Sequence, residues 1–286
     1  MFWQTTRYAI DLTQPRIAGI VNVTPDSFSD GGQHGTTSSA LRHCEQLLKD
    51  GAHILDIGGE STRPGAQPLP LHEELARLLP VVREAVKLGL PISVDTYKPQ
   101  VMQAVLDLGA DILNDIWAFR LDGAAQVVAR HPNCGVCLMH MHREPQTMQG
   151  APMTGDVVPQ VLSFLERTAK ALQGLGVDKA RIMLDPGIGF GKTVAQNFEL
   201  LARQRELLVA GYPILAGWSR KSSLAAVAAV DGHEPLASER MVPSVAAALL
   251  AVARGAAIVR VHDVRETVAA LKVLNAMNTI ARNVDT

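Results

Sequence analysis

The stretch Arg181–Thr193 is RIMLDPGIGFGKT. Ile182–Leu184 are three consecutive apolar residues, typical of a buried strand, and Asp185 stands at the carboxyl end of that strand. Pro186 and Gly187 then end it, because proline lacks the N–H that a β-ladder uses and glycine adopts backbone angles that other residues avoid. The pattern therefore predicts a carboxylate held at the mouth of a strand.

The same stretch is close to two phosphate-binding motifs but matches neither. A P-loop requires glycine where Pro186 stands, and a dinucleotide-binding fingerprint requires glycine where Lys192 stands. An isolated aspartate in such a turn would have little meaning. Its importance comes from the recurrence of the same pattern, a short apolar run followed by a polar residue, along the whole chain.

Apolar runs of strand length alternate with longer segments of helical periodicity, which indicates repeated βα units and a parallel sheet. The predicted strands are Ile17–Val23, His53–Ile57, Ile92–Val94, Asp111–Ile116, Val136–His140, Arg181–Asp185, Pro213–Gly217 and Ala256–Val261. The predicted helices are Ser39–Asp50, His72–Leu88, Gln100–Leu108, Gly123–His131, Val157–Leu175, Ala195–Ala210, Pro243–Arg254 and Arg265–Ala281. Eight repeats in 286 residues favour an α/β fold with a closed (β/α)8 TIM barrel, as a single domain over 1–286, with a doubly wound sheet as the alternative. Tyr8–Leu12 predicts a short extra strand or hairpin that covers the barrel bottom.

Composition and charge limit the possible partners. The chain is 47% hydrophobic and 19% charged, with a formal net charge of -1, so no overall basic field favours nucleic acid or an anionic membrane. The N-terminus is interrupted by Gln4, Arg7 and Asp11, which argues against a signal peptide. The most apolar helix, Val245–Ala253, ends at Arg254 and is too short to span a bilayer. We therefore expect a cytoplasmic protein.

The three cysteines favour reduced thiols over a disulfide framework. Cys134, Cys137, His140 and His142 have a spacing that suggests zinc. If this segment is a strand, however, alternation places His140 and His142 on one face and Cys137 on the other. The spacing therefore disfavours a zinc site.

Two long connections are rich in glycine, proline and hydroxyl residues. They are TPDSFSDGGQHGTTS after the first strand and GGESTRPGAQPLP after the second. Long loops of this kind in a compact barrel are typical of lids and binding loops. We expect both to be mobile and to lie on the catalytic face.

Polar residues follow the predicted strands one after another. They are Asn22, Asp56, Glu60, Asp95, Asn114, Asp115, His140, Asp185, Ser219, Arg220, Lys221, Arg260 and His262. A barrel gathers its strand ends around one axis, so these residues are expected to converge on one pocket. The carboxylates and amides suit the edge of a flat, nitrogen-rich heterocycle, and the cations, with Arg63, suit a polyanion. The pattern indicates a ligand with both parts.

The sequence resembles the bacterial dihydropteroate synthase family, the sulfonamide targets of folate synthesis. The resemblance extends from about Ile17 to Leu274 and rests on the blocks GIVNVTPDSFSDGG, LDIGGESTRPGA, ISVDTYKP, ILNDI, CLMHMH, LDPGIGFGK, GWSRKSS and VRVHDV. It implies a TIM barrel that condenses (7,8-dihydropterin-6-yl)methyl diphosphate with 4-aminobenzoate, with the help of Mg2+. It also implies a homodimer built from C-terminal helices.

The resemblance also implies roles for individual residues. The residues expected to bind the pterin diphosphate are Asn22, Thr62, Arg63, Asp95, Asn114, Asp185, Lys221, Arg260 and His262, with Asn22 as the magnesium contact. The residues expected to bind 4-aminobenzoate are Phe28, Thr62, Arg63, Pro64, Phe190, Lys221 and Ser222. Those expected to take part in catalysis are Arg63, Lys221, Arg260 and His262.

Some positions depart from the family pattern, and two other functions stay open. The departures are Tyr97, Trp117, His142, Arg143 and Trp218, all expected near the pocket rim. A packing role for the two tryptophans is the alternative. One alternative is a pterin-binding methyltransferase barrel, which does not need the SRK and RVH segments. The other is a catalytically silent pterin-binding relative, which an assay of diphosphate release would distinguish.

Overall fold

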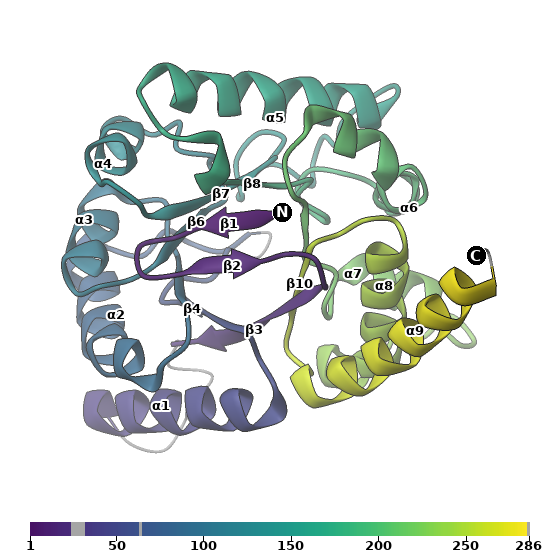
Figure 1. The fold of residues 1–286 in the computed structure, drawn as a ribbon, viewed down its shortest axis with the longest axis horizontal. Helices are drawn as coiled ribbons and strands as arrows, with labels where there is room; N and C mark the ends of the chain where they lie inside the picture. The colour runs from purple at the N-terminus through teal and green to yellow at the C-terminus, as the bar shows by residue number, and fades with distance from the viewer. Residues whose placement is uncertain (24–31, 63–64, 285–286) are drawn as a thin grey trace.

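A closed parallel β-barrel forms the centre of the computed structural model, which describes residues 1–23, 32–62 and 65–284, and the side chains of these except 32–36 and 281–284 (Figure 1). Its strands are β3 (Arg16–Asn22), β4 (Ile54–Gly58), β5 (Ile92–Asp95), β6 (Ile112–Asp115), β7 (Gly135–Met139), β8 (Ile182–Asp185), β9 (Leu215–Ala216) and β10 (Ile258–Val261). The spatial order is β8-β7-β6-β5-β4-β3-β10-β9, and a parallel bridge between Leu184 and Ile214 joins the two ends. The predicted TIM barrel is confirmed, and the doubly wound alternative is wrong.

The helices surround the barrel, as Figure 1 shows. They are α1 (Gly32–Asp50), α2 (Leu71–Ala85), α3 (Pro99–Asp107), α4 (Ala124–Arg130), α5 (Val157–Gly174), α6 (Val194–Ala202), α7 (Ser222–Val227), α8 (Met241–Ala253) and α9 (Val264–Val284). Short 3-10 segments add η2 (Val86–Leu88), η3 (Lys179–Arg181), η4 (Gln204–Ala210) and η5 (Ala237–Glu239). Across the described residues, every helix is too short or too polar to span a lipid bilayer.

Three helical predictions differ from the structure. Helix α1 begins at Gly32 rather than Ser39, in a segment whose glycine and threonine are poor helix formers, so composition favoured a loop there. The helix predicted over Ala195–Ala210 is broken at Arg203, which separates α6 from η4. The Arg203 guanidinium donates hydrogen bonds to Glu199 at 2.7 Å and to Glu206 at 2.8 Å. Helix α7 was not predicted.

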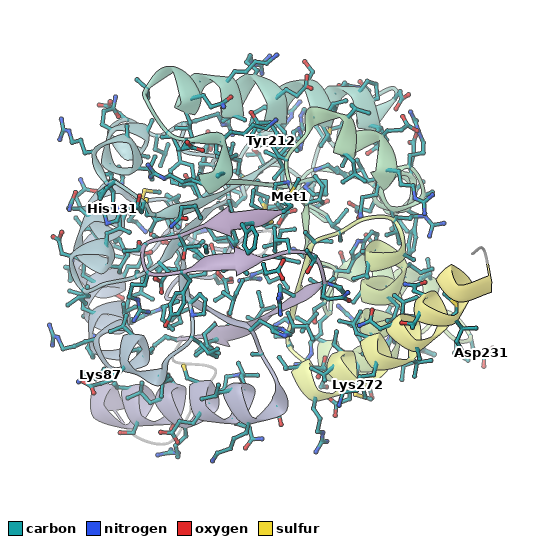
Figure 2. All side chains as sticks on the ribbon, viewed as in Figure 1. Met1, Lys87, His131, Tyr212, Asp231 and Lys272 are labelled. Atoms are coloured by element: carbon teal, nitrogen blue, oxygen red, sulfur yellow. The ribbon has the colours of Figure 1, made fainter. Side chains whose placement is uncertain are left out.

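Side chains fill the barrel interior (Figure 2). They form an apolar lower layer and an upper layer that contains the polar residues. The lower layer contains Ala18, Ile54, Ile112, Cys137, Met183, Leu215 and Ile258. Side chains along a strand alternate between its two faces, so the residue two positions later points to the same side. The residues at those positions are Ile20, Asp56, Asn114, Met139, Asp185, Gly217 and Arg260. Four of these residues, Asp56, Asn114, Asp185 and Arg260, are polar, so the polar side chains lie directly above the apolar lower layer.

A β-hairpin closes the bottom of the barrel, as predicted. Strands β1 (Phe2–Gln4) and β2 (Ala9–Asp11) pair antiparallel and lie across the barrel in Figure 1. Trp3 and Ile10 are buried against the lower layer, and the Trp3 indole donates a hydrogen bond to the carbonyl of Arg181 at 2.8 Å. The hairpin therefore excludes water from the side opposite the polar layer.

Replacing Trp3 with alanine is expected to lower the free energy of unfolding by about 3–5 kcal/mol, because a fully buried aromatic ring and its hydrogen bond are lost. Phe2→Ala is the matched control, since Phe2 is 60% exposed, and it should change stability little. Urea unfolding of both variants measures the effect. Equal losses in the two variants would show that the hairpin does not seal the barrel.

Candidate active site

A pocket at the carboxyl ends of the strands collects most of the predicted site residues that the structure describes. Its lining includes Thr62, Asp95, Asn114, Asp185, Phe190, Lys221 and Arg260. Asn22 ends β3, Ser222 begins α7, and His262 follows β10. Phe28, Arg63 and Pro64 lie outside the described residues. The predicted convergence of strand ends is thus observed for the side chains that line this pocket.

Arg260 lies between two carboxylates of the upper layer. Its Nε donates to Asp56 at 2.5 Å, and its Nη2 donates to Asp95 at 3.0 Å. Ser93 donates to the other oxygen of Asp56 at 2.5 Å. Burial by itself lowers the pKa of Arg260, but Asp56 and Asp95 raise it above its usual value. The guanidinium is therefore a fixed cation whose orientation is set by carboxylates on β4 and β5.

Asp95 is not fully compensated by that contact. Burial raises the pKa of Asp95 to about 7, the carboxylates of Asp56 and Glu74 act in the same direction, and Arg260 opposes them. A buried carboxylate with so little compensation gains from any N–H donor that a ligand brings. Asp95 is therefore suited to bind a donor-rich ligand edge.

Asp185 is held by the turn that follows β8. The backbone N–H of Gly187 donates to its Oδ1 at 2.7 Å, and burial raises its pKa while Lys221 and Arg260 lower it. Gly187 has φ +68°, and a Cβ there would lie 1.8 Å from the carbonyl oxygen of His140. Only glycine fits this position, which agrees with the prediction that Pro186 and Gly187 end the strand.

Lys221 and Phe190 form one wall of the pocket. The Lys221 ammonium lies 4.2 Å from the centroid of the Phe190 ring, within the range of a cation–π interaction. Lys221 immediately precedes α7. This wall of the pocket therefore combines a cation, an aromatic face and the first residues of a helix.

The segments after β9 and β10 are tied together. The hydroxyl of Ser219 lies 2.9 Å from Nδ1 of His262 and accepts the His262 backbone N–H at 3.1 Å. Arg220, at φ +60°, binds Asp263 at 2.7 Å. These contacts hold the segment that carries His262 against the segment that leads to Lys221.

Three of the departures from the family pattern lie in two places. Tyr97 and Trp117, with ring centroids 6.5 Å apart, line a second pocket that shares Thr62 and Ile116 with the first. Tyr97 donates to Glu60 at 2.6 Å. Trp218 is 2% exposed and packs on Phe198 at 5.2 Å, so it is a packing residue.

The residues of the zinc-like spacing lie in different surroundings. Cys137 belongs to the apolar lower layer, Cys134 accepts a hydrogen bond from Arg181 at 3.2 Å, and His140 faces Lys192 at 3.0 Å. Within the described part of the chain, no group of three or more His, Cys, Asp or Glu side chains is arranged to hold a metal ion.

Two contributors had been given no individual role in the predicted site. Asp56 stood among the polar strand ends, but its pairing with Arg260 joins residues far apart in the sequence. Its place two residues after Ile54 on an inward face was the available signal. Lys192 is 2% exposed inside the loop after Asp185, and only its position in the LDPGIGFGK block pointed to it.

Comparison with known proteins identifies the family. A family model described as pterin binding enzyme matches residues 18–262. A dihydropteroate synthase of Neisseria meningitidis serogroup B is 48% identical over 280 residues, which cover 96% of this chain and 97% of the relative. The crystal structure of Burkholderia cenocepacia dihydropteroate synthase complexed with 7,8-dihydropteroate has a TM-score of 0.89 and 49% identity, covering 99% of this chain and 98% of that chain. A Yersinia pestis dihydropteroate synthase with a sulfonamide drug has a TM-score of 0.90 and 40% identity, covering 98% and 100%. The chain therefore belongs to the pterin-binding enzymes and, among them, to the dihydropteroate synthases.

Proposed function

We propose that this dihydropteroate synthase joins (7,8-dihydropterin-6-yl)methyl diphosphate to 4-aminobenzoate in the pocket at the strand ends, giving 7,8-dihydropteroate and diphosphate. One observation carries the proposal: Asp95, Asn114 and Asp185 line the same pocket as Lys221 and Arg260. Acceptors for a heterocycle and cations for a diphosphate are thus adjacent.

The pterin edge is assigned to the carboxylates and the amide. A pterin presents neighbouring N–H donors and ring acceptors, and Asp95, Asn114 and Asp185 supply the complementary groups. Asp95 keeps one oxygen on Arg260, and Asp185 keeps one on Gly187, so each retains lone pairs for the ligand. Thr62 and Lys221 complete this end, and Arg260 stacks on the ring.

The diphosphate end is assigned to Asn22, Arg63, Arg260 and His262. When the bond between the methylene carbon and the diphosphate oxygen breaks, its electron pair stays on the diphosphate, and nearby cations stabilise that charge. The pterin ring delocalises the cation left on the methylene. The amine of 4-aminobenzoate then forms the new C–N bond and loses a proton to solvent, so no strong general base is required.

The 4-aminobenzoate end is assigned to Phe28, Thr62, Arg63, Pro64, Phe190, Lys221 and Ser222. The Phe190 ring offers an apolar face to the benzene ring, and the Lys221 ammonium beside it is suited to the carboxylate. The amine then faces the methylene carbon bound next to it.

Mg2+ fits the diphosphate end through Asn22. Magnesium prefers oxygen ligands and often takes only one or two from the protein, with substrate phosphates supplying others. The side-chain oxygen of Asn22, at the carboxyl end of β3, would supply such a ligand, and the ion would neutralise charge on the leaving diphosphate.

The quaternary state and compartment are also proposals. Exposed apolar side chains gather on the C-terminal helices: Val242 and Leu250 on α8, and Val273, Met277 and Ile280 on α9. Such a surface supports a homodimer built from these helices. The buried free thiols of Cys44, Cys134 and Cys137 suit the reducing cytoplasm.

The reaction is tested by diphosphate release. Release is expected only when both substrates and Mg2+ are present, and a sulfonamide should inhibit it in competition with 4-aminobenzoate, because the drug's aniline ring and acidic group mimic that substrate. Release that does not depend on 4-aminobenzoate would contradict the assignment. No release at all would favour the catalytically silent alternative. Inhibition that excess 4-aminobenzoate fails to relieve would show that the sulfonamide and 4-aminobenzoate do not share a site.

Asp185→Asn is expected to weaken pterin binding by roughly 1–3 kcal/mol or more, because the amide NH2 faces a ligand donor and leaves it unpaired. Asp122→Asn, at an exposed position, is the control. Calorimetric titration with a pterin measures both. Unchanged affinity in a folded Asp185→Asn protein would exclude Asp185 from the pterin site.

Pterin affinity should rise with pH up to about 7 and then level off. Asp95, with its pKa raised to about 7, is protonated below that value in the free protein, and a ligand N–H donor requires the ionised form. Affinity should therefore fall by up to about tenfold for each pH unit below 7. The same titration on Asp95→Asn should be weaker and flatter. Parallel profiles in the two proteins would assign the pH dependence to another group.

A further inference from the structure

Lys192 is a buried cation that the proposed reaction does not use. Its side chain lies in the loop after β8 and is 2% exposed. Nζ donates to the carbonyl of Gly187 at 2.8 Å and to that of Phe190 at 3.2 Å, and it lies 3.0 Å from Nδ1 of His140. An ammonium group has three N–H donors, so each has an acceptor.

His140 acts as the acceptor in the third contact. Burial and the charge of Lys192 lower the pKa of His140 to about 2, so its ring is neutral and Nδ1 can accept. The His140 backbone N–H donates to the carbonyl of Asp185 at 2.9 Å, and its ring packs edge-on against Phe164 at 4.9 Å. His140 is thus fixed to the barrel, and Lys192 links it to the loop.

Three further backbone groups of the loop are also bonded. The carbonyl of Gly189 accepts from Gln149 at 2.8 Å, the N–H of Gly189 donates to Asn197 at 2.8 Å, and the carbonyl of Gly191 accepts from Met153 at 2.9 Å. Burial lowers the pKa of Lys192 to about 7, whereas the carboxylate of Asp185 favours the ammonium form, as do the three acceptors. The ammonium group therefore holds the centre of the loop.

Two pocket residues depend on this loop. Phe190 is held through its carbonyl, and Asp185 is held through the N–H of Gly187, whose own carbonyl binds Lys192. We propose that Lys192 is a positioning residue, which holds Phe190 as the aromatic wall for 4-aminobenzoate and keeps Asp185 in place and ionised for the pterin. This inference rests on the proposed roles of Phe190 and Asp185.

Lys192 also acts on the charge state of Asp185, together with the other titratable groups that face this carboxyl group. Lys221 after β9, Arg260 on β10 and Lys192 in the loop favour its ionised form, whereas the Cys137 thiol on β7 lies among apolar residues. His140 is neutral. Loss of Lys192 removes one of three cations, so the pKa of Asp185 should rise, and the change should be measurable in the Asp95→Asn background, where the acid limb assigned to Asp95 is absent.

The test compares Lys192→Met with Lys170→Met, at an exposed position on α5. Lys192→Met is expected to raise KM for 4-aminobenzoate at least tenfold, with a smaller change in kcat. In the Asp95→Asn background, Lys192→Met should move the remaining acid limb of pterin affinity to higher pH. Lys170→Met should change neither. His140→Asn keeps an acceptor near Nδ1 and should stay within about threefold of the wild type, whereas His140→Leu should resemble Lys192→Met.

Phe190→Ala separates failure of the inference from failure of the proposed site. If Phe190→Ala leaves KM for 4-aminobenzoate unchanged, the site assignment is wrong. If Phe190→Ala raises KM but Lys192→Met changes neither KM nor, in the Asp95→Asn background, the acid limb of pterin affinity, the inference is overturned. In the double variant, the two effects on KM should overlap rather than multiply. If Lys192→Met does not fold, the histidine pair decides, and equal behaviour of His140→Leu and His140→Asn overturns the inference.

Discussion

The two-residue repeat of the β-strand is the constraint on which both the barrel and its site depend. Met183 in the lower layer is followed by Asp185 in the upper layer, and Ile258 by Arg260. The residues between them, such as Leu184, belong to the core under the helices. A shift of one residue in any strand would place apolar groups in the pocket and charges beneath the helices. Fold and site are therefore specified together.

These buried charges are tolerated because they are paired, although the pairing is unequal. Burial of an ion costs free energy unless partners replace water. Here the guanidinium of Arg260 forms ion pairs with both Asp56 and Asp95. One guanidinium shared by two carboxylates leaves Asp95 with a raised pKa. A ligand that brings both N–H donors and an anionic group relieves this imbalance. Some stability of the empty protein is thus given up for binding.

The parts of the site that follow from local pattern could be predicted from the sequence. Asp95, Asn114 and Asp185 were found because each ends an apolar run, and a barrel must gather such ends. The pairing of Asp56 with Arg260 could not be, since it depends on strands distant in the chain. The start of α1 and the break at Arg203 also escaped prediction, because single-residue propensity is a weak guide to where a helix begins and ends.

The near-match of the loop after Asp185 to a P-loop has a physical explanation. A P-loop directs backbone N–H groups at a phosphate, and proline in place of its first glycine would remove a donor. Here the carbonyls of Gly187 and Phe190 instead point inward to the ammonium of Lys192, and the N–H of Gly187 turns to Asp185. The loop therefore encloses a cation of its own chain rather than an anionic ligand. Glycines serve both arrangements, because close backbone approach is needed in each, but the polarity of the loop is reversed.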